Sequence, residues 1–263
     1  MSKNFNAFKI AWETAYMVAK NRNILNAIKA RQNAKINTRE FYKNLENKYW
    51  IKVEYKFWDN SLENFPEIVE AIEKYIYEGI NNDIIPKLFI WNHQAFWLEA
   101  LWAYDYFSID WKIVLKDDLI KPPFFGDWIK SIDPIIHYRN DKDLEDKRIE
   151  KIKKQVLENK AVLIYPEWTR SKNWKLRWFQ RKLYKPAYDI ISDSSNEISS
   201  KVAIITSDTF NVLPNTLENS LLFMWELNPW NITYTIDIVD ASLYENIKIF
   251  NNYAMNIIKW NLI

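Results

Sequence analysis

Short apolar segments alternate with amphipathic segments through the middle of the chain. This alternation restricts the possible folds more than any other feature of the sequence. The apolar segments show the period-two or continuous hydrophobic patterns of strands, and the segments between them repeat hydrophobic residues every three or four positions, as helices do. Parallel strands need helical crossovers, so this order favours a parallel sheet with helices packed against it. We expect an α/β fold with a mainly parallel twisted sheet flanked by helices.

The same patterns place the individual elements. Strands are expected at 51–57, 88–91, 111–115, 134–138, 161–165 and 200–207, and helices at 65–80, 95–106, 127–132, 142–160, 182–192 and 243–263. Segments 221–226 and 232–239 flank the turn residues Asn228 and Pro229, which predicts a hairpin.

The N-terminal segment has helical patterns of its own at 4–35 and 38–48. We therefore expect an N-terminal helical extension over 1–48 and one α/β domain over 49–263. The first helix is amphipathic and basic, so it could lie on a membrane surface or pack on the domain.

The composition excludes several classes of protein. The 263 residues include no cysteine, which excludes disulfides, thiolate metal sites and a cysteine nucleophile. The net charge of +2 gives no argument for nucleic acid binding, although basic and aromatic residues interleave between 172 and 185. No apolar run approaches the roughly 18 residues that span a bilayer, and the first residues lack a signal-peptide pattern. We expect a cytoplasmic protein.

Glycine is nearly absent, whereas tryptophan is abundant. Average usage would give about 18 glycines, but the chain has 2 glycines and 14 tryptophans. Trp111, Trp174 and Trp230 follow Asp, Asn or Pro at places where a tight turn usually needs glycine. We interpret several tryptophans as glycines encoded by a reassigned UGA codon. The alternative is a genuinely tryptophan-rich protein that binds carbohydrate or a membrane interface.

Two polar motifs and one arginine follow expected strands. Asn92-His93-Gln94 ends the strand 88–91, and Glu99 lies in the helical pattern beyond it. A histidine at such a corner can act as a general base that a nearby acid orients, although a surface histidine at a helix start is the plain alternative. Tyr165-Pro166-Glu167-Trp168-Thr169-Arg170-Ser171 is the second motif, and Arg139 ends the strand 134–138. His137, beside Arg139, is expected to be structural.

Together these residues resemble the glycerolipid acyltransferase family, over roughly 50–240. That family carries Asn-His-Gln-Ser followed by an Asp, then an arginine after a Gly/Phe-rich segment, and later Phe-Pro-Glu-Gly-Thr-Arg-Ser. Reading Trp168, Trp174 and Trp178 as glycine brings the second motif close to the family pattern. The chain departs from this pattern in two ways. The acid is Glu99 rather than Asp, and five residues rather than four separate it from His93. The chain also lacks the proline that the family has in the strand corresponding to 202–207.

The resemblance implies transfer of a fatty acyl group from acyl-CoA or acyl carrier protein to the hydroxyl of a lysophosphatidic-acid-like acceptor, giving phosphatidic acid in phospholipid biosynthesis. His93 would remove the hydroxyl proton, and Glu99 would orient its ring. Arginine pairs with phosphate through two N–H groups, so Arg139 and Arg170 would bind the acceptor phosphate. The substrate-binding residues implied are Asn92, Arg139, Glu167, Trp168, Thr169 and Arg170.

The resemblance implies no metal site and no resident cofactor, because the acyl thioester is a co-substrate. A lysophospholipid acceptor lies in a bilayer, so we expect a peripheral protein on the inner face of the cell membrane, with no nucleic acid partner. The alternatives are an acyltransferase for glycerol-3-phosphate, another lysophospholipid or a lipid A precursor, a non-catalytic lipid-surface binding protein, and a nucleic-acid binder.

Overall fold

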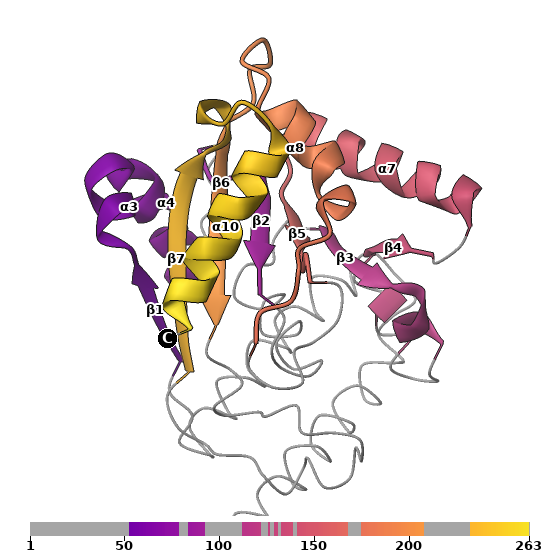
Figure 1. Ribbon diagram of the computed structural model, residues 1–263, viewed down its shortest axis with the longest axis horizontal. Helices are drawn as coiled ribbons and strands as arrows, with labels where there is room; N and C mark the ends of the chain where they lie inside the picture. The colour runs from indigo at the N-terminus through magenta and orange to yellow at the C-terminus, as the bar shows by residue number, and fades with distance from the viewer. Residues whose placement is uncertain are drawn as a thin grey trace, which may run out of the picture.

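A seven-stranded sheet forms the centre of the computed structural model (Figure 1). The structure describes residues 53–78, 84–92, 112–121, 126, 129–130, 133–138, 141–167, 175–207 and 232–262. In spatial order the strands are β1 (Val53–Phe57), β7 (Ile232–Asp240), β6 (Lys201–Ser207), β2 (Leu88–Trp91), β5 (Val162–Ile164), β3 (Lys112–Lys116) and β4 (Ile135–His137). Its neighbouring strands are parallel, except that β6 and β7 are antiparallel. The mainly parallel sheet expected from the sequence is therefore confirmed.

Strand β7 has two partners that are distant in the sequence. It pairs antiparallel with β6, with Asp237 opposite Ile204, and parallel with β1, with Tyr234 opposite Tyr55. Both edges of β7 are thus occupied, so the expected hairpin is not the pairing that this strand makes. The turn residues near Asn228 favour a local partner, whereas the extended edges of β6 and β1 offer a longer ladder. The other predicted arm, 221–226, lies outside the described residues.

The described helices fall within or close to the predicted helical segments, apart from α3 and two short 3₁₀ turns. The α-helices are α3 (Asp59–Asn64), α4 (Pro66–Glu78), α7 (Lys142–Leu157), α8 (Lys185–Ile191) and α10 (Ile247–Asn261), and the 3₁₀ turns are η2 (Asp117–Ile120), η3 (Arg181–Leu183) and η5 (Ala241–Leu243). Proline begins α4, where its missing N–H costs nothing. Asp141 and Asn246 cap α7 and α10 by accepting backbone N–H groups. The predicted helices at 4–35, 38–48 and 95–106, and so the boundary at residue 48, lie outside the described residues.

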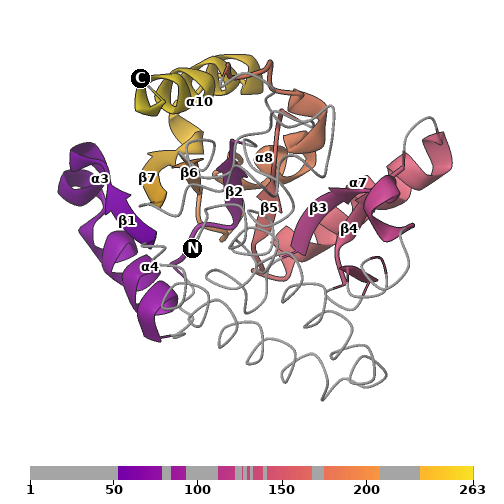
Figure 2. The same cartoon turned by 90° about the horizontal axis from the view of Figure 1, so that it is seen from below.

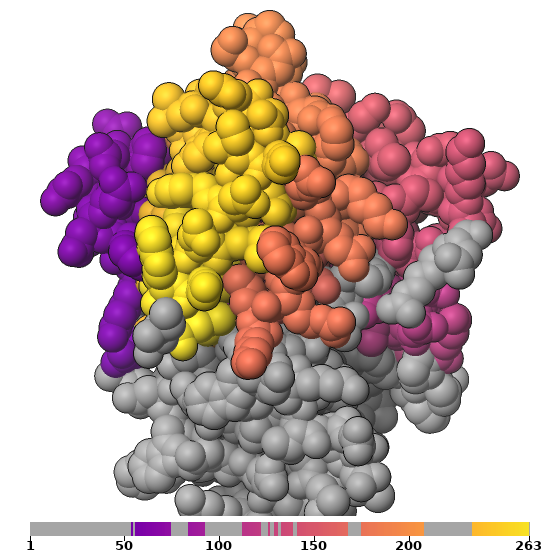
Figure 3. All heavy atoms as spheres, viewed as in Figure 1, coloured from indigo at the N-terminus to yellow at the C-terminus, as the bar shows by residue number. Residues whose placement is uncertain are grey.

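Helices α7, α8 and α10 pack with one face of the sheet to form the main core (Figures 1 and 2). Figure 3 shows α10 filling the front of the molecule between α3 and α8. Leu88 and Ile90 of β2 point into this core, whereas Phe89, on the opposite face, is also 0% exposed. Strands buried on both faces carry continuous apolar runs, which explains why β2, β5 and β6 are so uniformly hydrophobic.

The strand directions define one edge of the sheet that matters for function. Strands β2, β3, β4, β5 and β6 all end at the same edge, which we call the carboxyl edge, whereas β1 and β7 run the opposite way. Ligands of open α/β sheets bind outside such carboxyl ends. In the part of the chain that the structure describes, no helix combines the length and apolar character needed to cross a bilayer.

Candidate active site

Asn92 is the first residue of the Asn-His-Gln motif, and it directly follows β2 at the carboxyl edge. Its side chain is buried, with 0% exposure. Nδ2 donates to the carbonyl oxygen of Ser207 at 3.1 Å, and Oδ1 accepts from the Ser207 N–H at 2.7 Å. The backbone N–H of Asn92 donates to the carbonyl oxygen of Ile205 at 3.3 Å. The corner that precedes His93 is therefore tied to the end of β6.

Glu167 follows β5 and is also buried, with 3% exposure. Its Oε2 accepts the backbone N–H of Arg177 at 2.8 Å. Beside it, the carbonyl oxygen of Pro166 accepts the N–H of Gln180 at 2.8 Å. These two hydrogen bonds join the ends of the loop that carries the second motif, so Glu167 closes this loop.

The structure brings Asn92 and Glu167 to neighbouring positions on the carboxyl edge. Strands β2 and β5 are adjacent and parallel, with Ile90 opposite Ile164. Asn92 stands two residues beyond this pair, and Glu167 stands three residues beyond it. Neighbouring strands lie about 4.8 Å apart. Asn92 and Glu167 therefore lie at neighbouring strand ends on the carboxyl edge.

An aromatic cluster supports this corner from within the sheet. Trp91 is 0% exposed, and its ring meets that of Tyr234 edge-on, with centroids 4.9 Å apart. The ring of Tyr165, which follows β5, lies 6.1 Å from that of Trp91. Edge-to-face packing of this kind restricts ring motion and adds to the stability gained from burial.

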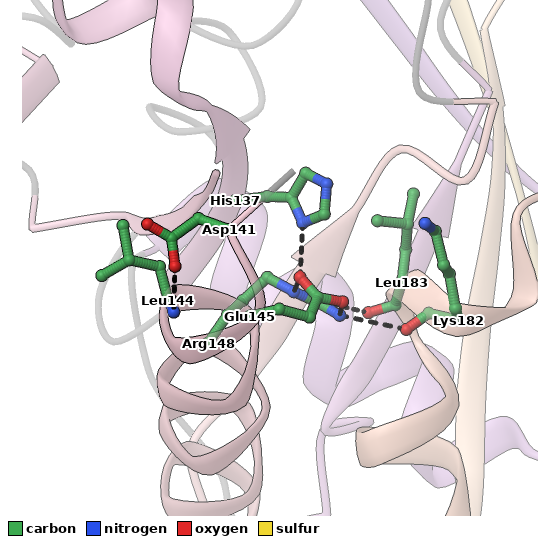
Figure 4. Close-up of polar contacts among 7 residues, drawn as sticks. All are labelled: His137, Asp141, Leu144, Glu145, Arg148, Lys182 and Leu183. Atoms are coloured by element: carbon green, nitrogen blue, oxygen red, sulfur yellow. Dashed lines mark hydrogen bonds and ion pairs between the residues drawn. The ribbon is translucent and has the colours of Figure 1, made fainter. Parts of the chain in front are cut away.

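A buried ionic network lies at the end of β4 (Figure 4). His137 Nδ1 is 2.8 Å from Oε2 of Glu145 on α7. Arg148 donates to both carboxylate oxygens of Glu145, from Nε at 2.9 Å and from Nη2 at 2.6 Å. The same guanidinium donates from Nη1 to the carbonyl oxygen of Leu183 at 3.0 Å and from Nη2 to that of Lys182 at 3.2 Å. The network thus connects β4, α7 and η3.

The charges in this network shift two pKa values. Burial lowers the pKa of His137, and the attraction of Glu145 opposes this effect without overcoming it. Burial alone would raise the pKa of Glu145, but hydrogen bonding and charge from Arg148, with help from His137, hold it below its usual value. A neutral His137 held by an ionised Glu145 fits the structural role that the sequence predicts for this histidine.

Most of the predicted site residues lie outside the described residues: His93, Glu99, Arg139, Trp168, Thr169 and Arg170. The structure instead describes the residues next to them, namely Asn92, His137 and Glu167. The substrate contacts assigned to Asn92 and Glu167 stay predictions, since their described hydrogen bonds are to protein. Over the described ranges, no group of three His, Cys, Asp or Glu side chains could hold a metal ion.

Sequence reasoning missed three residues that shape this edge. Ser207 carries no motif and is 115 positions from Asn92, so nothing in the sequence marks it as a partner. Glu145 and Arg148 have the spacing of a helical ion pair, which is a detectable signal. Their contacts with β4 and η3 depend on the fold and leave no local signal.

Comparison with known proteins identifies the family of this chain. Residues 69–205 match a family model described as Acyltransferase, a range that includes every predicted site residue. The structure resembles the crystal structure of the 1-acyl-sn-glycerophosphate (LPA) acyltransferase PlsC from Thermotoga maritima, with a TM-score of 0.64 and 17% sequence identity over 99% of this chain and 93% of that chain. At this identity the likeness concerns the fold. No curated protein matches the chain.

Proposed function

The chain belongs to the Acyltransferase family, and we propose that it transfers a fatty acyl group from acyl-CoA or acyl carrier protein to a lysophosphatidic-acid-like acceptor. In this reaction the acceptor hydroxyl oxygen attacks the thioester carbonyl carbon. The carbon–sulfur bond breaks, the thiol leaves with the proton taken from the hydroxyl, and the product is phosphatidic acid. The chain contains no cysteine that could form a thioester intermediate, and direct transfer needs none.

The observation that carries this proposal is the meeting of Asn92 and Glu167 on the carboxyl edge. Each is buried, and each begins or continues a motif of the family pattern. This placement puts the two polar motifs on adjacent strand ends at one edge of the sheet. It is the arrangement that a shared substrate requires.

The position of Asn92 supports His93 as the general base. His93 is the next residue, and consecutive Cα atoms are about 3.8 Å apart, so the bonds between Asn92 and Ser207 restrict the backbone from which the imidazole extends. An imidazole titrates near neutral pH, which suits it to accept the hydroxyl proton. Glu99 would orient this ring and stabilise its protonated form.

The ends of β4 and β5 support Arg139 and Arg170 as phosphate ligands. Arg139 comes two residues after His137, and Arg170 comes three residues after Glu167. Only β3 separates β4 from β5, so their ends are about 10 Å apart at the usual strand spacing. Long guanidinium side chains from both ends can meet at one phosphate. Glycine in place of Trp168 would let the backbone approach that phosphate closely.

The test is transfer of a labelled acyl group from a thioester to lysophosphatidate, with protein carrying glycine at positions 168, 174 and 178. His93→Ala is expected to lower kcat at least a hundredfold, the usual contribution of a general base. Arg170→Ala is expected mainly to raise the KM for the acceptor. Equal turnover by His93→Ala and the parent protein would contradict the assignment of His93.

A panel of acceptors addresses the finer proposals. Glycerol-3-phosphate, other lysophospholipids and a lipid A precursor are compared with lysophosphatidate, and acyl-CoA is compared with acyl carrier protein. We also propose a peripheral attachment to the membrane, because the acceptor lies in a bilayer, and vesicle flotation tests it. Binding to vesicles without release of thiol from any thioester would favour a non-catalytic lipid-binding protein.

A further inference from the structure

Arg148 joins two segments of the candidate active site that are far apart in the sequence. Its side chain is 0% exposed, although it carries a full positive charge. Glu145 neutralises that charge with a two-pronged ion pair on the same helix. The remaining donors reach the carbonyl oxygens of Lys182 and Leu183, which are 34 and 35 positions away (Figure 4).

One side of this contact leads to the end of β4. Glu145, the ion-pair partner of Arg148, also lies 2.8 Å from Nδ1 of His137, the last residue of β4. The two oxygens of one carboxylate therefore hold the strand end and the guanidinium together. Arg139 follows this strand end by two residues.

The other side leads to the loop of the second motif. Lys182 and Leu183 belong to η3, which directly follows the segment in which the backbone N–H groups of Arg177 and Gln180 donate to Glu167 and Pro166. The carbonyl groups that Arg148 holds thus belong to the returning end of the loop that contains Arg170. Two carbonyl acceptors and a carboxylate use the planar fork of arginine, which lysine does not possess.

We propose that Arg148 is a positioning residue that sets the spacing between the end of β4 and the loop after β5, and through it the spacing of the two phosphate-binding arginines. This inference rests on the proposed function for its effect on catalysis. Glu145 does not satisfy every N–H group of this buried guanidinium, and the carbonyl groups of η3 accept others. The contacts with η3 and, through Glu145, with β4 extend the network to the two segments that lead to Arg139 and Arg170.

The first experiment measures kinetics of Arg148→Lys, which keeps the charge and loses the fork. The KM for lysophosphatidate is expected to rise about tenfold, because small displacements of binding groups are costly. The donor KM, kcat and the turnover of monoacylglycerol, an acceptor without phosphate, are expected to stay within about twofold. Lys147→Ala, at an exposed position on the same helix, is the matched control and is expected to behave as the parent protein.

The second experiment is hydrogen exchange of the same proteins without substrate. Arg148→Lys is expected to speed exchange of the Arg177 and Gln180 amides at least several-fold, and to leave the Ser207 amide unchanged. Glu145→Gln provides a second folded variant if the lysine variant unfolds, and the same amides are expected to respond. If the parent protein transfers no acyl group, the proposed function fails, and the exchange data alone decide whether Arg148 organises the loop.

Two outcomes overturn the inference. In a folded variant, an unchanged acceptor KM together with unchanged exchange at Arg177 and Gln180 shows that Arg148 positions nothing. An equal loss of kcat with phosphate-bearing and phosphate-free acceptors shows a general structural role instead.

Discussion

Asn92 and Ser207 are joined by two hydrogen bonds in which one side-chain amide meets both the N–H and the carbonyl group of one residue. This pattern imitates the ladder between β2 and β6 and extends it beyond the last backbone pair, Trp91 with Ile205. The order of the sheet is thereby carried to the residue before His93. If His93 is the general base, as proposed, it needs such a restrained starting point, because the distance of a base from the hydroxyl decides its effect.

We predict that Asn92→Asp destabilises the protein by about 2 kcal/mol, the usual cost of an unsatisfied buried polar group. The carboxylate could still accept the Ser207 N–H, but it would face the Ser207 carbonyl oxygen with no proton to donate. Urea unfolding measures the loss. Asn252→Asp, the same change at an exposed position on α10, is the control. A variant as stable as the parent would show that the two bonds contribute little.

We predict that His137 makes the protein less stable as the pH falls below about 6.5, the ordinary pKa of histidine. The folded pKa is lowered by burial, so the unfolded chain takes up a proton first and stability declines towards the lower folded value. The groups that face His137 are Glu145, Arg148 and Lys182. His137→Gln is expected to flatten the dependence of the unfolding free energy on pH between 6.5 and 5.

His93, the other histidine of the chain, supplies the comparison for this experiment. His93→Gln in the same pH series shows how much of the slope belongs to His137. An undiminished slope in His137→Gln would assign the effect elsewhere.

We predict that Asp237→Asn stabilises the protein at neutral pH by about 1 kcal/mol. Asp237 is 3% exposed, accepts a hydrogen bond from Ser61 Oγ at 2.8 Å, and has a pKa raised by burial. An acid with a raised folded pKa contributes stability at pH values below its unfolded pKa and loses it as the pH rises. The gain from Asp237→Asn is therefore expected to grow as the pH rises from 4, as measured by unfolding at several pH values.

Asp240, on the same strand, is the matched control, because its pKa is shifted in the opposite direction. Burial would raise its pKa, but hydrogen bonds from Lys201 and Ser242 hold that pKa well below its usual range. Asp240→Asn is therefore expected to destabilise the protein at neutral pH, with the difference vanishing in strong acid. The same sign for both variants would contradict these pKa directions.

We predict that Gly126→Ala lowers stability by about 1–3 kcal/mol, the usual cost of overpacking. A Cβ at this position would lie 2.3 Å from the carbonyl oxygen of Ile120 and 2.6 Å from its carbonyl carbon. Both are backbone atoms, so the main chain itself would have to shift. Thermal unfolding measures the effect, with Lys130→Ala at an exposed position as the control.

We predict that the gene has UGA codons at Trp168, Trp174 and Trp178, and that the native protein is correspondingly lighter than the printed sequence. Trp178 is 80% exposed, so Trp178→Gly is expected to change stability by less than about 0.5 kcal/mol. Intact mass of protein from its own organism decides the matter. UGG codons at these positions would end the interpretation.

The strands at the centre of the sheet are predictable from the sequence because their chemistry is local. The segments around Leu88 and Val162 are continuous apolar runs bounded by polar residues, and this pattern is typical of strands buried on both faces. The start of α7 is predictable for the same reason, since Asp141 stands at the N-cap position. The two motifs follow these strands directly, so their meeting at one edge follows from parallel topology.

The direction of β7 and the partners of the site residues could not be predicted in this way. Asp237 pairs with Ile204 across the antiparallel ladder, whereas the nearby turn residues indicate a different pairing. Nothing in the sequence around Ser207 marks it as the partner of Asn92, and only the fold brings the two residues together. Contacts across a sheet depend on register and topology, which a single sequence does not record.

The reversed pair of outer strands bears on the order in which this protein assembles. In the described part of the chain, β1 pairs with β7 and with no other strand. Val53 therefore cannot pair until Ile232 has been synthesised. During synthesis β1 and α3 cannot form their contacts with β7 until β7 has emerged from the ribosome, because Ser61 and Asp237 are 176 positions apart. Until then β1 lacks its strand partner, and unpaired strand edges are prone to aggregation.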